Sequence, residues 1–166
     1  MTTVAGTAAA YLPAPKEVRD LIGALLDRQV DLRPAPPFGV APTYPASVAT
    51  YVDDSLIVRA LVAFDLPLSA HVGAALALVP ASQAVAAVEE GRVEGSVAES
   101  LREVFNIVGS LFNAPGALHL RLHACHVSGE PLPHDVRART QALGHRCDFL
   151  VTVGGYGSGR VAVVLL

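Results

Sequence analysis

The most regular pattern of apolar and polar positions in the chain covers residues 96–113. Its apolar side chains recur every three or four residues, the spacing of one helix face: Val97, Leu101, Val104, Val108 and Leu111. Ser96 and Glu99 have the spacing of a capping box before this run. Asn113, followed by Ala-Pro-Gly, is expected to close the helix in the left-handed conformation. The pattern therefore predicts an amphipathic helix over residues 96–113.

Shorter runs with helical spacing precede this segment. They predict helices over residues 15–28, about 69–79 and about 81–90. Pro15 suits the first turn of the first helix. Ser69 is expected to cap the second helix, and Gly91 is expected to end the third.

Strand patterns occupy much of the remaining chain. Apolar runs predict strands over about 47–53, 56–65, 117–127, 148–153 and 160–166, with a short helix or loop over 133–143. The turns Asp53-Asp54-Ser55 and Gly154–Gly159 predict two hairpins, and residues 33–46, with five prolines, predict an extended connector. The strongly apolar last strand must be covered or paired, which indicates a central place in the sheet or a dimer seam.

Composition places these elements in one folded unit. The chain has 166 residues, of which 52 % are hydrophobic and 16 % are charged, and a domain of this length buries roughly 70 % of its chain surface. The elements predict an α/β fold, α+β in the stricter sense: a single domain with a largely antiparallel sheet packed by helices. Residues 1–14 are expected to be a flexible leader, and residues 15–166 the domain.

Charge, hydropathy and cysteine content limit the partners and the location that we expect for the protein. A formal net charge of -3 without a basic run disfavours nucleic-acid binding. The longest charge-free window, residues 66–88, contains Pro67 and Pro80 and is a poor membrane span. Two cysteines are too few for a disulfide scaffold, and the N-terminus lacks the basic start of a secretory signal. We expect a cytoplasmic protein with neither nucleic-acid nor membrane partners.

Polar side chains gather on the side of the 96–113 helix opposite its apolar stripe, because successive residues turn by about 100°. They are Glu99, Glu103, Asn106 and Ser110. Glu103 and Asn106 are three residues apart, so their side chains project side by side. Asparagine is a mediocre helix former, and Asn106 has no capping role to explain it. This side is either a solvated face or a contact surface for a partner.

The segment from Leu101 to Phe112 reads Leu-Arg-Glu-Val-Phe-Asn-Ile-Val-Gly-Ser-Leu-Phe and resembles the motif helix of the CheC/CheX chemotaxis phosphatase family. The family signature Glu-x-x-Asn is matched by Glu103 and Asn106. The order of elements over residues 15–166 is similar as well. The resemblance implies a CheX-like fold and a phosphatase acting on the phosphoaspartate of a CheY-type response regulator receiver domain.

The same resemblance implies a role for each residue of this face. Asn106 would orient the attacking water, and Glu103 would pair with a lysine of the receiver domain. Glu99 and Ser110 are expected to contact the same partner. No cofactor is expected on this chain, since Mg²⁺ would belong to the receiver domain. A homodimer is expected by analogy with CheX.

Two other functions stay open. A non-catalytic CheX-like interaction module in two-component or chemotaxis signalling would keep the architecture without the activity. A zinc site would need a cross-strand set from His123, Cys125, His145 and Cys147, because His119 and His123 would lie roughly 13 Å apart along one strand. The glycine-rich segment precedes a strand, so it predicts a hairpin turn and not a phosphate loop.

Overall fold

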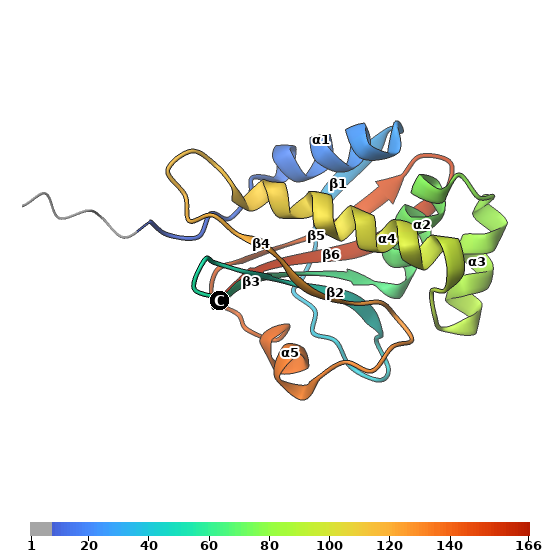
Figure 1. The fold of residues 1–166 in the computed structure, drawn as a ribbon. Helices are drawn as coiled ribbons and strands as arrows, with labels where there is room; N and C mark the ends of the chain where they lie inside the picture. The colour runs from blue at the N-terminus through green and yellow to red at the C-terminus, as the bar shows by residue number, and fades with distance from the viewer. Residues whose placement is uncertain (1–7) are drawn as a thin grey trace, which may run out of the picture.

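A six-stranded sheet forms the centre of the molecule (Figure 1). The computed structural model describes residues 8–166, and its strands follow the order β1-β5-β6-β3-β2-β4, each neighbouring pair antiparallel. The strands are β1 (Val30–Pro34), β2 (Ala46–Val52), β3 (Val58–Asp65), β4 (Arg121–His126), β5 (Arg146–Val153) and β6 (Gly157–Leu165). The predicted class, a largely antiparallel sheet packed by helices, is confirmed.

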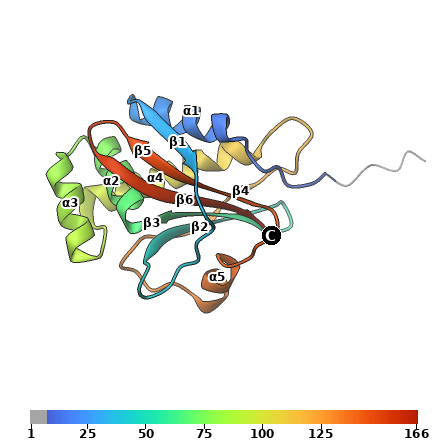
Figure 2. The ribbon, with the colours of Figure 1, turned by 180° about the vertical axis from the view of Figure 1, so that it is seen from behind.

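Helices cover both faces of this sheet, and the larger core lies on the face that carries three of them. The helices are α1 (Pro15–Leu26), α2 (Leu66–Ala77), α3 (Ala81–Glu90), α4 (Gly95–Val108) and α5 (His134–Arg139), with a 3-10 turn over Gly109–Phe112. α1, α2 and α4 cover one face, while α5 and the β1–β2 connector cover the other (Figures 1 and 2). No helix within residues 8–166 is long and apolar enough to cross a bilayer.

The last strand lies inside the sheet, which agrees with the central place considered for it. β6 pairs with β5 on one side and with β3 on the other. Both expected hairpins, β2–β3 and β5–β6, are present. The strand β1 was not predicted. It pairs with β5 at one edge of the sheet, where Pro34 is tolerated because the outer side of an edge strand needs no ladder hydrogen bond.

The cap of helix α2 is Asp65, four residues before the predicted cap. Strand β3 runs directly into the helix, and the carboxylate of Asp65 accepts a hydrogen bond from the Leu68 N–H at 2.9 Å. The prediction that Ser69 caps this helix is therefore wrong, since its hydroxyl donates to carbonyls of the preceding turn. The predicted end of α3 is confirmed, because Gly91 adopts the left-handed conformation with φ 77°.

Helix α4 lacks both predicted end signals. Its N-cap is Glu94 without a side-chain cap, so Ser96 and Glu99 already lie inside the helix and form no capping box. Asn113 is not left-handed, with φ -94° and ψ 47°. Its side-chain amide instead bonds both the N–H and the carbonyl of Leu120. Asn113 therefore holds the loop before β4.

Residues 8–14 lie against the loop that precedes β4. The Leu118 N–H donates to the Ala9 carbonyl at 3.0 Å, and Pro13 is buried. The Tyr11 hydroxyl donates to the Glu17 carboxylate at the start of α1. The described part of the expected leader thus contacts the domain, and residues 1–7 of that leader lie outside the described residues.

A buried arginine ties together the second face of the sheet. Arg146 on β5 donates to both carboxylate oxygens of Asp148, at 2.8 Å each. It also donates to the carbonyls of Phe38, Thr140 and Ala142, at 2.8–3.0 Å. The Arg146 and Asp148 side chains are only 5 % and 3 % exposed. One side chain thus joins β5, the segment after α5 and the β1–β2 connector.

Strand β4 forms the other edge of the sheet, and this edge is partly blocked against pairing with a further strand. Its ladder with β2 changes register, which leaves His123 as an extra residue between two paired positions. Arg102 of α4 donates to the Cys125 carbonyl at 3.1 Å and forms an ion pair with Glu130. A helix side chain therefore occupies a backbone acceptor at this edge.

Candidate functional site

Helix α4 lies on the sheet with one face buried and the other open (Figure 1). Leu101, Val104 and Phe105 are 0 % exposed and belong to the larger core. The Phe105 ring packs on Phe64 of β3 with the ring centroids 4.8 Å apart. The four residues on the opposite face are all exposed: Glu99, Glu103, Asn106 and Ser110. The predicted outward orientation of this face is confirmed.

Glu103 and Asn106 stand one turn apart on this open face. Helical residues three apart have Cβ atoms about 5–6 Å from each other, so one visiting group can contact both side chains. Within residues 8–166 neither side chain takes part in a hydrogen bond or ion pair, whereas Arg102 beside them is engaged with β4. An amide can donate to and accept from water at once, and a carboxylate binds an ammonium group by a charge-assisted hydrogen bond.

The part of α4 that carries Asn106 is supported from the sheet. Tyr51 of β2 is 0 % exposed, and its hydroxyl donates to the Phe105 carbonyl at 2.6 Å. The sequence did not point to this residue, because all seven residues of β2 are buried and their pattern does not tell which side chain reaches a helix.

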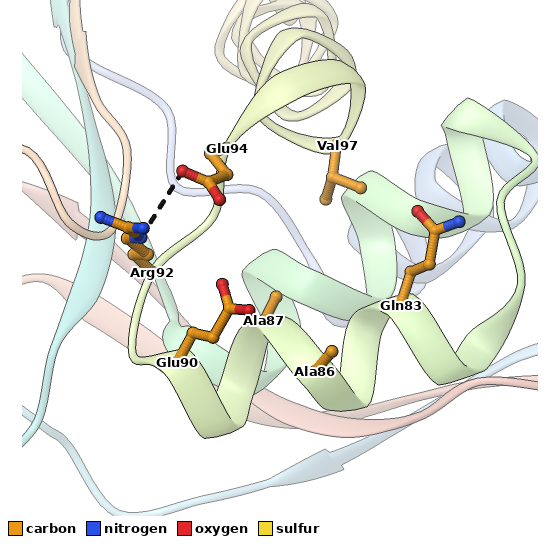
Figure 3. A pocket seen from close by; sticks show the side chains of 7 residues that line it. All are labelled: Gln83, Ala86, Ala87, Glu90, Arg92, Glu94 and Val97. Carbon is orange, nitrogen blue, oxygen red and sulfur yellow. Dashed lines mark ion pairs between the residues drawn. The ribbon is translucent and has the colours of Figure 1, made fainter.

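Three hollows of the surface lie away from the Glu103–Asn106 pair. Three open hollows measure about 190, 330 and 320 Å³, at or below the lower end of the range for ligand pockets. Figure 3 shows the first, between α3 and the start of α4, where Arg92 and Glu94 form an ion pair at 3.5 Å. Neither Glu103 nor Asn106 lines any of the three. The pair therefore lies on an exposed helix face outside these three hollows.

The histidines and cysteines do not assemble into the metal site that was considered. His123 and Cys125 lie on β4, whereas Cys147 lies on β5, and three strands separate β4 from β5. At about 4.8 Å per strand this is far beyond the reach of one ion. Burial raises the pKa of both thiols, Cys125 and Cys147, to about 11, which disfavours the thiolate that binds zinc. Residues 8–166 contain no group of three or more candidate ligands.

Comparison with known proteins gives matches among solved structures alone, since neither a family model nor a curated protein matches the chain. The FliM middle domain of Vibrio alginolyticus aligns with a TM-score of 0.57 and 11 % identity, over 92 % of this chain and 87 % of that one. FliM of H. pylori aligns in its complex with SpeE (TM-score 0.57, 7 % identity, 90 % and 80 % covered). It also aligns in its complex with FliG (TM-score 0.54, 8 % identity, 90 % and 84 % covered).

At identities this low the likeness establishes the fold and no activity. It extends over 90–92 % of this chain. Residues 101–112 raised the expectation of a CheC/CheX-like architecture, and the alignment with FliM middle domains is consistent with it. The chain thus has the fold of the FliM middle domain.

Proposed function

We propose that this chain is a phosphatase that docks α4 against a CheY-type receiver domain and hydrolyses its phosphoaspartate. The observation that carries the proposal is the exposed pair Glu103 and Asn106, adjacent on a helix whose other face is fully packed. Its match to the family signature Glu-x-x-Asn supports the same reading. A rigid helix suits this chemistry, because phosphoryl transfer depends chiefly on positioning and electrostatics.

Asn106 supplies the positioning of water. Its side-chain oxygen accepts a hydrogen bond from the water, and its NH₂ group donates to an oxygen of the phosphoryl group. The water oxygen then attacks phosphorus while the bond from phosphorus to the aspartate oxygen breaks, which releases inorganic phosphate and restores the aspartate carboxylate. Holding the water in line removes much of the entropy cost of the step.

Glu103 fixes how the two proteins are aligned with each other. Its carboxylate, one turn from Asn106, pairs with a lysine ammonium group of the receiver domain. Glu99 and Ser110 extend the contact along the same face of α4. In this proposal Mg²⁺ is bound by the receiver domain, and the residues of this chain orient the water and the partner.

The proposal is tested by mixing the protein with a receiver domain phosphorylated by a small phosphodonor and following phosphate release. We expect release faster than spontaneous decay. Asn106→Ala should lower the accelerated rate of phosphate release by a factor on the order of 10², while complex formation persists. Glu103→Gln should weaken the complex. Gln83→Ala, which removes an exposed amide from α3, is the matched control and should behave as the wild type. Full acceleration by Asn106→Ala would show that the site assignment is wrong.

A second candidate is a non-catalytic interaction module of chemotaxis or flagellar signalling. It is favoured by the likeness to FliM chains, two of which were crystallised in complexes with FliG and SpeE. In this case the same α4 face binds a receiver domain without speeding phosphate release. Binding together with release at the spontaneous rate would select this candidate.

A homodimer is proposed by analogy with CheX alone. The last strand, one reason for expecting a dimer seam, is paired on both sides within the described fold. Light scattering tests the point, since a dimer should have twice the 17.2 kDa of one chain.

A further inference from the structure

Tyr51 lies where both ladders of β2 change register. The β2–β3 ladder shifts between Tyr51 and Val52, and the β2–β4 ladder shifts between Thr50 and Tyr51. Such irregularities re-aim side chains and are frequent next to functional sites. The ring of Tyr51 passes into the core beneath α4, where it is 0 % exposed.

The Tyr51 hydroxyl contacts the backbone directly before Asn106. It donates to the Phe105 carbonyl at 2.6 Å, and that carbonyl belongs to the planar peptide group whose N–H is the amide of Asn106. A buried hydroxyl and carbonyl that pair with each other hold their geometry, because leaving either group unpaired costs its desolvation. Burial also raises the pKa of Tyr51 well above its usual value, so the phenol stays a donor at neutral pH.

The close approach of this ring depends on Gly109. A Cβ at Gly109 would lie 3.0 Å from Cε1 and 3.4 Å from Cδ1 of Tyr51, tighter than ordinary packing allows. The 3-10 turn begins at the same residue, so the helix tightens three residues after Asn106. The Tyr51 ring also packs on Phe112, with the ring centroids 5.1 Å apart. Tyr51 thus contacts the chain before and after Asn106.

We infer that Tyr51 is a positioning residue, whose buried hydroxyl fixes the peptide group of Asn106 and so sets the direction in which the Asn106 amide meets its ligand. Tyr51 touches neither water nor phosphate and acts through the helix alone. The catalytic consequence rests on the proposed function, in which a misplacement of about 1 Å costs on the order of 10² in rate. The geometric part concerns the free protein.

The kinetic test is Tyr51→Phe, which keeps the ring and deletes the hydroxyl. We expect kcat for phosphate release from the phosphorylated receiver domain to fall about tenfold, with KM within about twofold of the wild type, because the face that binds the partner is retained. Gly109→Ala should likewise lower kcat and leave KM nearly unchanged, because the added methyl group displaces the Tyr51 ring. The matched control is Tyr44→Phe, which removes a hydroxyl that donates to Asp65 at 2.7 Å and should leave both constants unchanged.

The structural test is amide hydrogen exchange by NMR on the free proteins. In Tyr51→Phe the Asn106 amide resonance should shift. The amides of Asn106 and Gly109 should also exchange about fivefold faster, because the helix turn between them, which packs on the Tyr51 ring, opens more readily once the bond from Tyr51 to the Phe105 carbonyl is lost. Tyr44→Phe should change neither amide. A folded Tyr51→Phe variant whose Asn106 and Gly109 amides match the wild type overturns the inference.

The two measurements separate the inference from the proposed function. If the wild type speeds phosphate release and Tyr51→Phe has the same kcat, the inference fails and the proposed function stands. If the wild type does not speed release, the proposed function fails and hydrogen exchange decides: altered Asn106 and Gly109 amides support the positioning role, and unaltered amides refute it.

Discussion

Removal of the buried guanidinium of Arg146 should destabilise the fold more than removal of its partner carboxylate. In Arg146→Met the Asp148 carboxylate, 3 % exposed, loses both hydrogen bonds that it accepts. The carbonyls of Phe38, Thr140 and Ala142 lose their donor at the same time. In Asp148→Leu the guanidinium keeps those three carbonyls, which solvate its charge.

The geometry sets the size of both effects. Removing one partner of a buried ion pair costs about 3–5 kcal/mol, because the remaining charge stays buried. We expect about 4 kcal/mol for Arg146→Met, since the Asp148 side chain has no other bonding partner within residues 8–166. For Asp148→Leu we expect about 2 kcal/mol, since three charge-assisted hydrogen bonds to Arg146 persist.

Urea unfolding followed by far-UV circular dichroism measures both changes, with equal m-values as the sign that the same two states are compared. Lys16→Met removes the exposed ion pair with Asp20, whose side chains are 77 % and 51 % exposed, and should give no measurable change. If Asp148→Leu is as destabilising as Arg146→Met, the three carbonyls do not solvate the guanidinium and the reasoning is refuted.

Two further predictions concern buried titratable groups. Burial lowers the pKa of His71, partly opposed by the charge of Asp65, and the buried Nδ1 atom has no hydrogen-bond partner within residues 8–166. Below about pH 6.5 the unfolded chain therefore binds a proton that the folded chain does not, so the free energy of unfolding should be highest above that pH and fall below it. His71→Gln should lose this part of the pH slope, and an unchanged slope contradicts the assignment. Burial raises the pKa of Cys125 and Cys147 to about 11, so alkylation at neutral pH should be slow in the native protein and fast in urea. Equal rates in both states would contradict this.

Periodicity predicted α4 and its open face because the helix is amphipathic. Its buried residues recur every three or four positions, so one pattern identified both the packed side and the side that carries Glu103 and Asn106. The helix ends were not predictable in the same way. A cap depends on which residue precedes the first turn in space, and both Asp65 and Glu94 come earlier than the pattern suggested.

Features that depend on pairing between residues far apart in the chain could not be predicted from the sequence. β1 has five residues and an alternating exposure typical of an edge, and it forms because β5, more than 100 residues later, pairs with it. The contact between Tyr51 and Phe105 likewise joins residues 54 positions apart. Buried strands read as uniform apolar runs, so their sequences do not reveal which side chain supports a site.

The hydrogen bond from Arg102 to the Cys125 carbonyl has a consequence for how copies of this protein meet in the crowded cell. An extended segment from a second molecule that tried to lengthen the sheet beyond β4 would meet an acceptor already in use and a backbone made irregular at His123. Pairing of sheet edges between molecules is a route to aggregation. Two consecutive residues of α4 thus differ: Arg102 occupies a backbone acceptor at the edge of the sheet, whereas the Glu103 side chain is exposed and forms no hydrogen bond or ion pair within residues 8–166.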